Sequence, residues 1–274
     1  MEYETIIEER RVNGVVKVTL NRPEKLNAIS PRMHSELRRC FEQIRLERTI
    51  RCVVITGAGR AFCAGADQGG AVERSGDARG PEERPALDLE GARLALRESG
   101  LAMMKALRNI DVPVIASVNG ACVGAGFDLA CTTDFCVGST AARYMVAYVR
   151  RGLYADLGGY WTIPKRIGMP KAMELMMTGA FMDAEEAHRY GMTNYLVPPE
   201  ELEAKTDWLA NSIAAGPPIG QKIGKMLAYR TANLDFDTAL EWSASVIGVV
   251  GTSQDRGEGT RAFLEKRDAK FSGY

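Results

Sequence analysis

The feature that most constrains this chain is a short apolar segment that runs into a glycine-rich turn, within the stretch 113–159. Residues 113–118 are almost wholly apolar and read as a buried strand. Asn119-Gly120 ends that strand, and Gly124-Ala125-Gly126 then predicts the start of a helix. Such a turn leaves unpaired backbone N–H groups at the positive end of a helix dipole. Because a developing oxyanion is stabilised there, the stretch predicts a catalytic loop.

Three polar side chains follow this turn. Asp128 and Asp156 are carboxylates, and Tyr148 lies between them in the sequence. A phenol with a pKa of about 10 donates a hydrogen bond but is a poor base near neutral pH. Structural alternatives stay open: Asp128 caps its helix, Tyr148 only lines a pocket, and Asp156 caps the next turn or pairs with Arg150 or Arg151.

The order of strand and helix patterns predicts an α/β core. β-branched or apolar runs at 15–20, 52–56, 113–118 and 194–197 alternate with helical patterns up to residue 197. Beyond Pro199 only helices are predicted. We therefore divide the chain into residues 1–198, a core that carries the site, and residues 199–274, a helical region for packing or oligomerisation. The helices expected in the second region are Leu202–Ala214, Pro217–Tyr229, Phe236–Val250 and Gln254–Lys266.

A segment before the organising stretch has the features of a ligand-covering loop. The small residues in 61–67 allow a ligand to approach the backbone closely. The run 68–90 is rich in Gly, Pro, Arg and acidic residues with little periodicity, so we expect a mobile loop over the site.

Charge and cysteine usage exclude several classes of protein. Lys plus Arg and Asp plus Glu each number 35, which argues against a nucleic-acid or membrane-surface binder. The six cysteines lack paired-ligand spacing and are expected to be reduced and buried, and only two histidines are present, so no metal site is predicted. The acidic start and the lack of an apolar run of about 20 residues predict a cytoplasmic protein with no membrane span.

Four segments, in this order, resemble the crotonase or enoyl-CoA hydratase/isomerase superfamily: residues 21–28, 61–67, 120–126 and 263–267. The resemblance covers nearly the whole chain. It implies a spiral of ββα units followed by C-terminal helices that build homotrimers, which usually pair into homohexamers. It also implies an acyl-CoA substrate, with coenzyme A as part of the substrate and no prosthetic group.

The resemblance also implies roles for individual residues. The two backbone N–H groups that polarise the thioester carbonyl in this family fall on Ala66 and Ala125. The family's contacts to coenzyme A fall on five positions. For the first of them, Lys25, the alternative is an exposed lysine that is solvated and binds no ligand. Those positions correspond to Lys25, Ala64, Asp67, Phe263 and Lys266.

The sequence departs from an ordinary hydratase at its acid/base positions. Asp128 replaces the first catalytic glutamate and Tyr148 replaces the second. Asp156 lies where the dienoyl-CoA isomerases of this superfamily carry an acid/base aspartate. We therefore expect an acyl-CoA enzyme in which Asp128 and Asp156 transfer protons or add water, Tyr148 orients water or substrate, and Ala66 and Ala125 stabilise a thioester enolate.

Two other functions stay open. Some ring-opening crotonases also lack a glutamate at the position of Tyr148, and residues 66–70 are loosely similar to theirs, so hydrolytic C–C cleavage of a cyclic β-keto acyl-CoA is an alternative. An RNA-binding homologue is the other, through arginines of the helix that Ser30-Pro31 is expected to begin, although the glutamates between them are more typical of a solvated helix face. Those arginines are Arg38, Arg39, Arg45 and Arg48.

Overall fold

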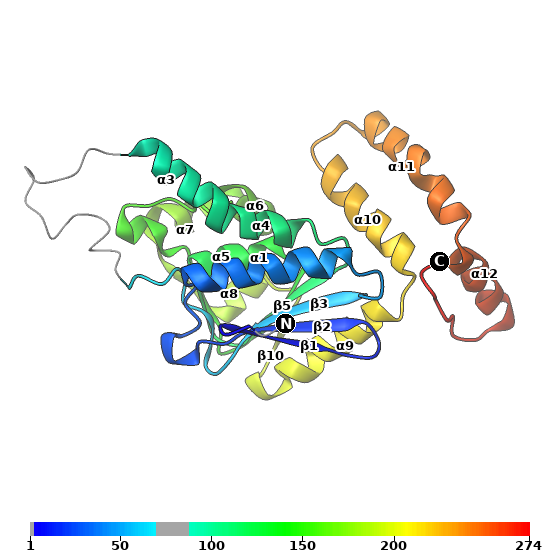
Figure 1. The fold of residues 1–274 in the computed structure, drawn as a ribbon, viewed down its shortest axis with the longest axis horizontal. Helices are drawn as coiled ribbons and strands as arrows, with labels where there is room; N and C mark the ends of the chain where they lie inside the picture. The colour runs from blue at the N-terminus through cyan, green and yellow to red at the C-terminus, as the bar shows by residue number, and fades with distance from the viewer. Residues whose placement is uncertain (1–2, 70–87) are drawn as a thin grey trace, which may run out of the picture.

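The computed structural model describes residues 3–69 and 88–274 (Figure 1). Most of the loop expected at 68–90, residues 70–87, lies outside the described residues. The end of that expected loop is helical instead, because α3 (Leu89–Leu96) begins there and the side chain of Asp88 caps it by accepting from the Gly91 N–H.

The larger of two sheets has six strands in the order β1-β2-β3-β5-β7-β10. The first two strands are antiparallel and the other pairings are parallel. Its four central strands are strongly buried, as continuous apolar runs in a parallel sheet require. The strands are β1 (Ile6–Arg10), β2 (Val15–Leu20), β3 (Cys52–Gly57), β5 (Val114–Val118), β7 (Phe135–Ser139) and β10 (Tyr195–Val197).

A smaller sheet runs alongside, in the order β4-β6-β8-β9, with strands Ala61–Cys63, Ala121–Val123, Arg143–Met145 and Phe181–Met182. Strands β3, β5 and β7 of the large sheet are each followed by one strand of the small sheet and then by a helix. The helices that close these turns are α3 with α4 (Ala102–Arg108), α5 (Ala125–Thr132) and α6 (Gly159–Ile167). The expected spiral of ββα units in an α/β fold is therefore confirmed.

Helix α1 (Pro31–Leu46) is amphipathic. Ser30 caps it by accepting from the Met33 N–H. The apolar residues of its inner face are all buried: Met33, Leu37, Cys40, Phe41 and Ile44. On the other face Arg38 pairs with Glu42 at 2.9 Å and Arg39 stacks over the Tyr3 ring. This face is thus charged and partly self-paired. All six cysteines are buried and free, as expected.

The C-terminal helices divide into one that covers the large sheet and three that project from the body (Figure 1). Leu202, Leu209 and Ala210 of α9 (Leu202–Ala214) form a second apolar cluster with side chains of the large sheet. Helices α10 (Pro218–Thr231), α11 (Phe236–Gly251) and α12 (Gln254–Glu265) extend away from it. The remaining elements are α7 (Met169–Thr178), α8 (Ala184–Arg189), the 3₁₀ turns Pro23–Lys25, Ala147–Arg151 and Pro199–Glu201, and a π-helical segment, Arg97–Leu101.

Helix α10 is anchored to the body by a polar cluster. Lys225 Nζ lies 2.6 Å from Asp134 Oδ2, and the Tyr229 hydroxyl donates to Asp134 Oδ1 at 2.7 Å. Burial lowers the pKa of Lys225, and the charge of Asp134 opposes that shift. Because breaking a buried pair leaves one charge uncompensated, this contact fixes the base of the projecting helices.

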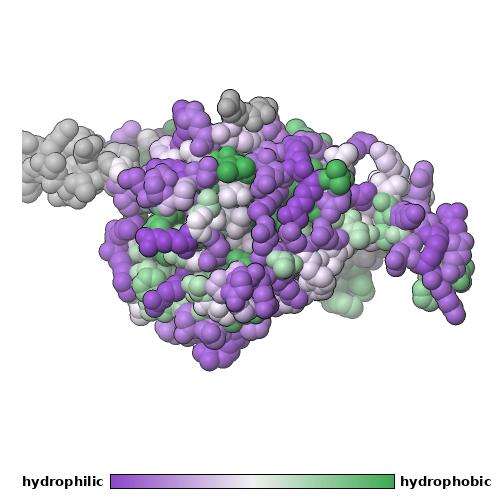
Figure 2. All heavy atoms as spheres, turned by 90° about the horizontal axis from the view of Figure 1, so that it is seen from below, coloured by the Kyte–Doolittle hydropathy of each residue, from purple (hydrophilic) through white to green (hydrophobic). Residues whose placement is uncertain are grey.

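The projecting end of the molecule carries exposed apolar side chains, including Phe236, Leu240 and Ile247 of α11. Figure 2, a view from below, shows green hydrophobic side chains among purple hydrophilic ones at this end. Among residues 3–69 and 88–274, no helix is long and apolar enough to cross a membrane.

Asn27 connects the segment before α1 to the turn between the two sheets. Its Oδ1 accepts from the Arg22 N–H at 2.9 Å, and its Nδ2 donates to the carbonyls of Ala58 and Ala61 at 2.9 and 2.7 Å. Its side chain is buried and its φ is +58°, a backbone region that asparagine tolerates better than most residues. The residue thus holds the beginning of β4 in place.

We predict that Asn27→Ala lowers the free energy of unfolding by about 3 kcal/mol, because it removes hydrogen bonds to one buried and one part-buried carbonyl and puts alanine at positive φ. Urea denaturation measures the change. Asn13→Ala, which removes a bond to Asn211 on the surface, is the matched control and should cost less than about 1 kcal/mol. Equal losses in the two variants would contradict this account.

Candidate active site

A cavity of about 140 Å³ lies where the two glycine-containing loops meet the start of α1 and the turn after β8. Its wall includes Ala66, Ala125, Tyr148 and Asp156, four of the five residues expected to be catalytic. Ala64, one of the expected coenzyme A contacts, lines it as well. The cavity therefore joins segments that are up to 123 residues apart in the sequence, counted from 34 to 157.

The two expected oxyanion donors occupy equivalent positions in successive ββα turns. Gly65 (φ +101°) precedes Ala66, and Gly124 (φ +54°) precedes Ala125, the first residue of α5. Both glycines have a positive φ, which L-residues with side chains rarely adopt. A Cβ on Gly65 would lie 3.1 Å from the Val123 carbonyl and 3.8 Å from the Ala125 nitrogen, so the loops are in contact.

Hydrogen bonds on either side of Ala66 fix its loop. The Ile29 N–H donates to the Gly65 carbonyl at 2.8 Å, and the Asp67 N–H donates to the Ile29 carbonyl at 2.9 Å. The N–H of Ala66 lies between these bonds and has no acceptor within the described part of the chain. The N–H of Ala125, in the first turn of α5, likewise has no acceptor there.

Asp128 lies behind the cavity wall. Its side chain is 0% exposed, and the Tyr148 hydroxyl donates to its Oδ2 at 2.6 Å. Its Oδ1 has no partner of ordinary hydrogen-bond geometry among residues 3–69 and 88–274, although the nearby Leu157 amide favours the charged form. The cap of α5 is Gly124, without a side-chain bond, so Asp128 is not the cap of its helix.

Burial determines the protonation of this pair. It raises the pKa of Asp128 to about 7, opposed by the hydrogen bond from Tyr148 and reinforced by the charge of Asp156. Burial also raises the pKa of Tyr148, with the Asp128 charge adding to the effect. The phenol thus stays protonated, while the carboxyl changes state near neutral pH.

Asp156 is the carboxylate on the cavity wall. Its side chain is half-buried, and burial raises the pKa of its carboxyl group. No ion pair with Arg150 or Arg151 is formed in the described structure. A carboxylate with a raised pKa at a cavity wall is suited to accept and return a proton.

The other expected coenzyme A contacts are not gathered at the cavity. Lys25 is exposed, near enough to Asp67 to help lower the pKa of that carboxyl group, for which the Gly69 N–H is the main cause. Asp67 itself is paired with Arg22 at 2.8 Å. Phe263 is 82% exposed on α12, and Lys266 follows it, both at the end of the molecule opposite α3 (Figure 1).

His34 is a cavity residue that the sequence analysis did not select. It lies in the first turn of α1, next to the buried Met33, and lines the cavity. Its Nε2 is buried and has no hydrogen-bond partner in the described structure. The only sequence signal was its place at the edge of the buried face of an amphipathic helix.

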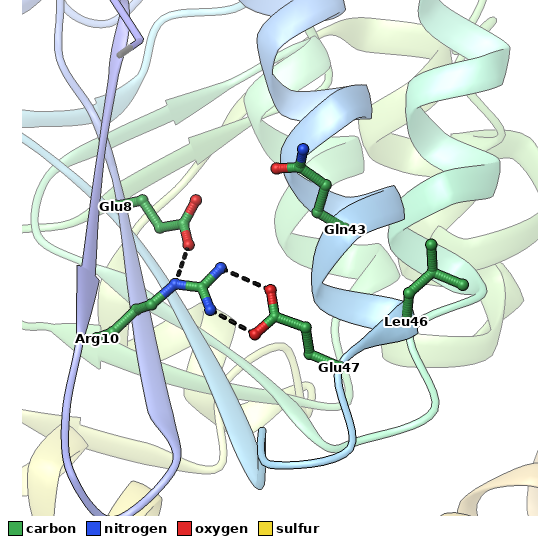
Figure 3. A pocket seen from close by; sticks show the side chains of 5 residues that line it. All are labelled: Glu8, Arg10, Gln43, Leu46 and Glu47. Carbon is green, nitrogen blue, oxygen red and sulfur yellow. Dashed lines mark hydrogen bonds and ion pairs between the residues drawn. The ribbon is translucent and has the colours of Figure 1, made fainter. Parts of the chain in front are cut away.

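A second hollow, between β1 and the end of α1, has no comparable chemistry (Figure 3). Arg10 donates to Glu8 at 2.6 Å and to both oxygens of Glu47 at 2.5 and 2.9 Å. The charged groups that line this hollow thus pair with one another, and exposed ion pairs of this kind contribute little to stability. In the described residues, no group of three or more His, Cys, Asp or Glu side chains is placed to hold a metal ion.

The known proteins that this chain resembles agree with one another in family. The family model described as enoyl-CoA hydratase/isomerase matches residues 10–274. The chain is 36% identical over 260 residues to 1,2-epoxyphenylacetyl-CoA isomerase of Escherichia coli K12, covering 95% of each chain. It is 31% identical to (E)-benzylidenesuccinyl-CoA hydratase of Thauera aromatica, covering 95% of this chain and 96% of that one. The crystal structure of enoyl-CoA hydratase from Bacillus anthracis superposes with a TM-score of 0.87 at 31% identity, over 99% of this chain and all of that one.

The raised pKa of Asp128 predicts a pH-dependent stability. Between the ordinary carboxyl pKa near 4 and about 7, the folded protein retains a proton that the unfolded chain releases. The free energy of unfolding therefore falls as pH rises through this window, by up to about 1.4 kcal/mol per pH unit. Asp128→Asn lacks this titration, so its stability relative to wild type should increase from pH 4 to pH 7. Denaturant melts across the window measure this difference; a constant difference would contradict the assignment.

Proposed function

The chain belongs to the enoyl-CoA hydratase/isomerase family, and we propose that it moves a double bond within the acyl group of a coenzyme A thioester by proton transfer. The observation that carries this proposal is a single cavity containing two free backbone N–H groups and one carboxylate. Coenzyme A enters as part of the substrate, and no prosthetic group takes part.

The two donors lie on contacting loops that follow neighbouring strands, an arrangement that suits one oxygen atom. Ala66 and Ala125 follow β4 and β6, which pair directly, and neighbouring strands lie about 4.8 Å apart. Two nitrogens at that separation, each about 2.9 Å from one oxygen, subtend an angle of about 110° at the oxygen, close to the directions of carbonyl lone pairs. A thioester enolate concentrates negative charge on this oxygen, so the donors stabilise it more than the neutral thioester; one such donor is typically worth about 3 kcal/mol.

Asp156 is the group that moves the proton. Its carboxylate removes a proton from a carbon of the unsaturated acyl chain, and the electron pair shifts through the conjugated system to the thioester oxygen. The carboxylic acid then returns the proton to a different carbon, the enolate collapses, and the double bond has moved without a change in mass. The raised pKa of Asp156 brings it closer to the working pH, which favours both halves of the exchange.

Tyr148 and Asp128 support this exchange from behind. The 2.6 Å hydrogen bond fixes the phenol at the cavity wall. When Asp128 is ionised, the Tyr148 proton points to it and the phenol oxygen only accepts hydrogen bonds from the substrate side. When Asp128 is protonated, it can donate to the phenol, whose own proton is then free to reach the substrate. Asp128 therefore acts through Tyr148 as a positioning residue.

Isomerisation fits this arrangement better than hydration does. Water addition by two acid/base groups requires both to reach the water, whereas Asp128 is covered by Tyr148. The ring-opening and RNA-binding alternatives stay predictions, and no contact in the described structure favours either. The mass of the product distinguishes ring opening from isomerisation, because ring opening adds one water molecule.

The cavity favours a compact acyl group. Its volume of about 140 Å³ is near that of the roughly 150 Å³ protein cavity that binds benzene. Leu96, Leu153 and Leu157 supply an apolar wall. The related E. coli enzyme carries a phenylacetyl group in the name of its substrate. We therefore propose a ring-bearing or short unsaturated acyl chain.

Asp156→Asn should lower kcat by about 10²- to 10⁴-fold on any unsaturated acyl-CoA that the wild type isomerises, because amide cannot take the proton. Tyr148→Phe, which keeps the ring, should have a smaller effect. Mass spectrometry and deuterium incorporation from heavy water measure the reaction, with Asp207→Asn on the surface as the control. Full turnover by Asp156→Asn, or products heavier by one water, would overturn the assignment.

We also propose that the projecting helices bind further copies of this chain in a homotrimer or homohexamer. Phe236, Leu240 and Ile247 fall on one stripe of α11, since four and eleven residues bring a helix back to nearly the same direction. Such a stripe is too apolar to be left in water at the end of three extended helices.

Ile247→Asp should shift the protein toward monomer, because an unpaired charge would be buried in the contact. Sedimentation velocity measures the change. Val249→Asp is the matched control: this residue is also exposed, but lies on the opposite side of α11. A wild-type protein that is monomeric at micromolar concentration would rule the proposal out.

A further inference from the structure

His34, on α1, packs at the cavity wall beside an unusual stretch of helix. The segment Arg97–Leu101, between α3 and α4, is π-helical, and such single-turn irregularities occur often at functional sites. A Cβ on Gly100 would lie 2.4 Å from Leu157 Cδ2 and 3.5 Å from His34 Cε1. The absence of that Cβ allows the segment, Leu157 and the imidazole to pack against one another at the cavity wall.

The imidazole carries an unsatisfied polar atom that lies covered at this apolar part of the wall. Nε2 of His34 is buried and has no hydrogen-bond partner within residues 3–69 and 88–274, and its neighbours in the cavity include Leu96 and Leu157. Leaving a buried polar atom unpaired costs free energy, so such atoms in folded proteins are usually paired or functional. The phenol in the cavity wall, Tyr148, already uses its proton on Asp128.

We propose that His34 Nε2 forms a hydrogen bond with a hydroxyl group on the acyl chain of the substrate, so that His34 selects hydroxylated acyl groups over plain hydrocarbon ones. This inference rests on the proposed function, because it assumes that an acyl-CoA occupies the cavity. It adds a substrate class that neither the oxyanion donors nor Asp156 specifies.

The chemistry of a buried imidazole favours a hydroxyl group as its partner. Burial lowers the pKa of His34, so the ring is neutral at neutral pH. Nε2 of a neutral imidazole either donates or accepts, according to the tautomer, and a hydroxyl group does both. A hydroxyl therefore satisfies Nε2 in either tautomer, whereas an alkyl chain leaves it unpaired.

Hydroxyl selectivity is measured best by binding, because binding does not depend on which reaction follows. The probes are hexanoyl-CoA and its 3-, 4-, 5- and 6-hydroxy derivatives, titrated calorimetrically into the full chain. The wild type should bind at least one hydroxy derivative about tenfold or more tighter than hexanoyl-CoA, because sites built to pair a substrate hydroxyl discriminate against analogues that lack it.

Two variants separate a hydrogen bond from a packing role. His34→Leu should abolish the preference for that derivative and leave the affinity for hexanoyl-CoA within about threefold, while His34→Gln, which keeps a hydrogen-bonding group, should restore part of it. His188→Gln is the matched control, because His188 bonds to Thr193 and does not line the cavity. His34→Gln also serves if His34→Leu does not fold.

The outcomes distinguish this inference from the proposed function. Equal wild-type affinity for all five thioesters, or an equal loss of affinity for all of them in both variants, would overturn the role of His34 but leave an acyl-CoA site in place. Failure of the wild type to bind any acyl-CoA would overturn the proposed function itself.

Discussion

The parallel pairing of β4 with β6 is the constraint on which the candidate site depends. Ala61 and Cys63 pair with Ala121 and Cys122, and the chain leaves both strands through a glycine at positive φ. The residues that follow present their N–H groups from neighbouring loops because their strands are neighbours. The next strand in this sheet, β8, leads to Tyr148, so successive turns of the spiral contribute donor, donor and phenol to one cavity.

The two aspartates of the candidate site differ in depth more than in kind. Asp156 is at the cavity wall, while Asp128 is sealed behind a phenol with one oxygen poorly paired. Removing a carboxyl group from water costs free energy unless it is protonated or fully hydrogen-bonded, which explains why its pKa moves toward neutrality. The same burial strengthens the Tyr148 hydrogen bond. Burying Asp128 therefore lowers the stability of the fold, but it fixes the phenol at the cavity wall.

The sequence predicted the elements that carry strong local signals. Helix α9 spans the predicted residues 202–214, and α1 begins after Ser30, where a serine cap precedes an apolar face. The three-residue strands of the small sheet were missed, since so few residues show no alternation, and α6 was missed because Pro164 lies inside it. Motif positions placed Ala66, Ala125, Tyr148 and Asp156 in one site, but spacing carries no information on depth, so the burial of Asp128 and the remoteness of Phe263 were not foreseeable.

Because of the small sheet, the geometry of the site does not depend on how many residues connect the segments that form it. The distance between the Ala66 and Ala125 amides follows from strand neighbours, whatever number of residues connects them. Insertions and deletions between β4 and β6 therefore leave the two amides in place. Substrate range in such an architecture can diverge through connecting segments alone, with the chemistry inherited unchanged.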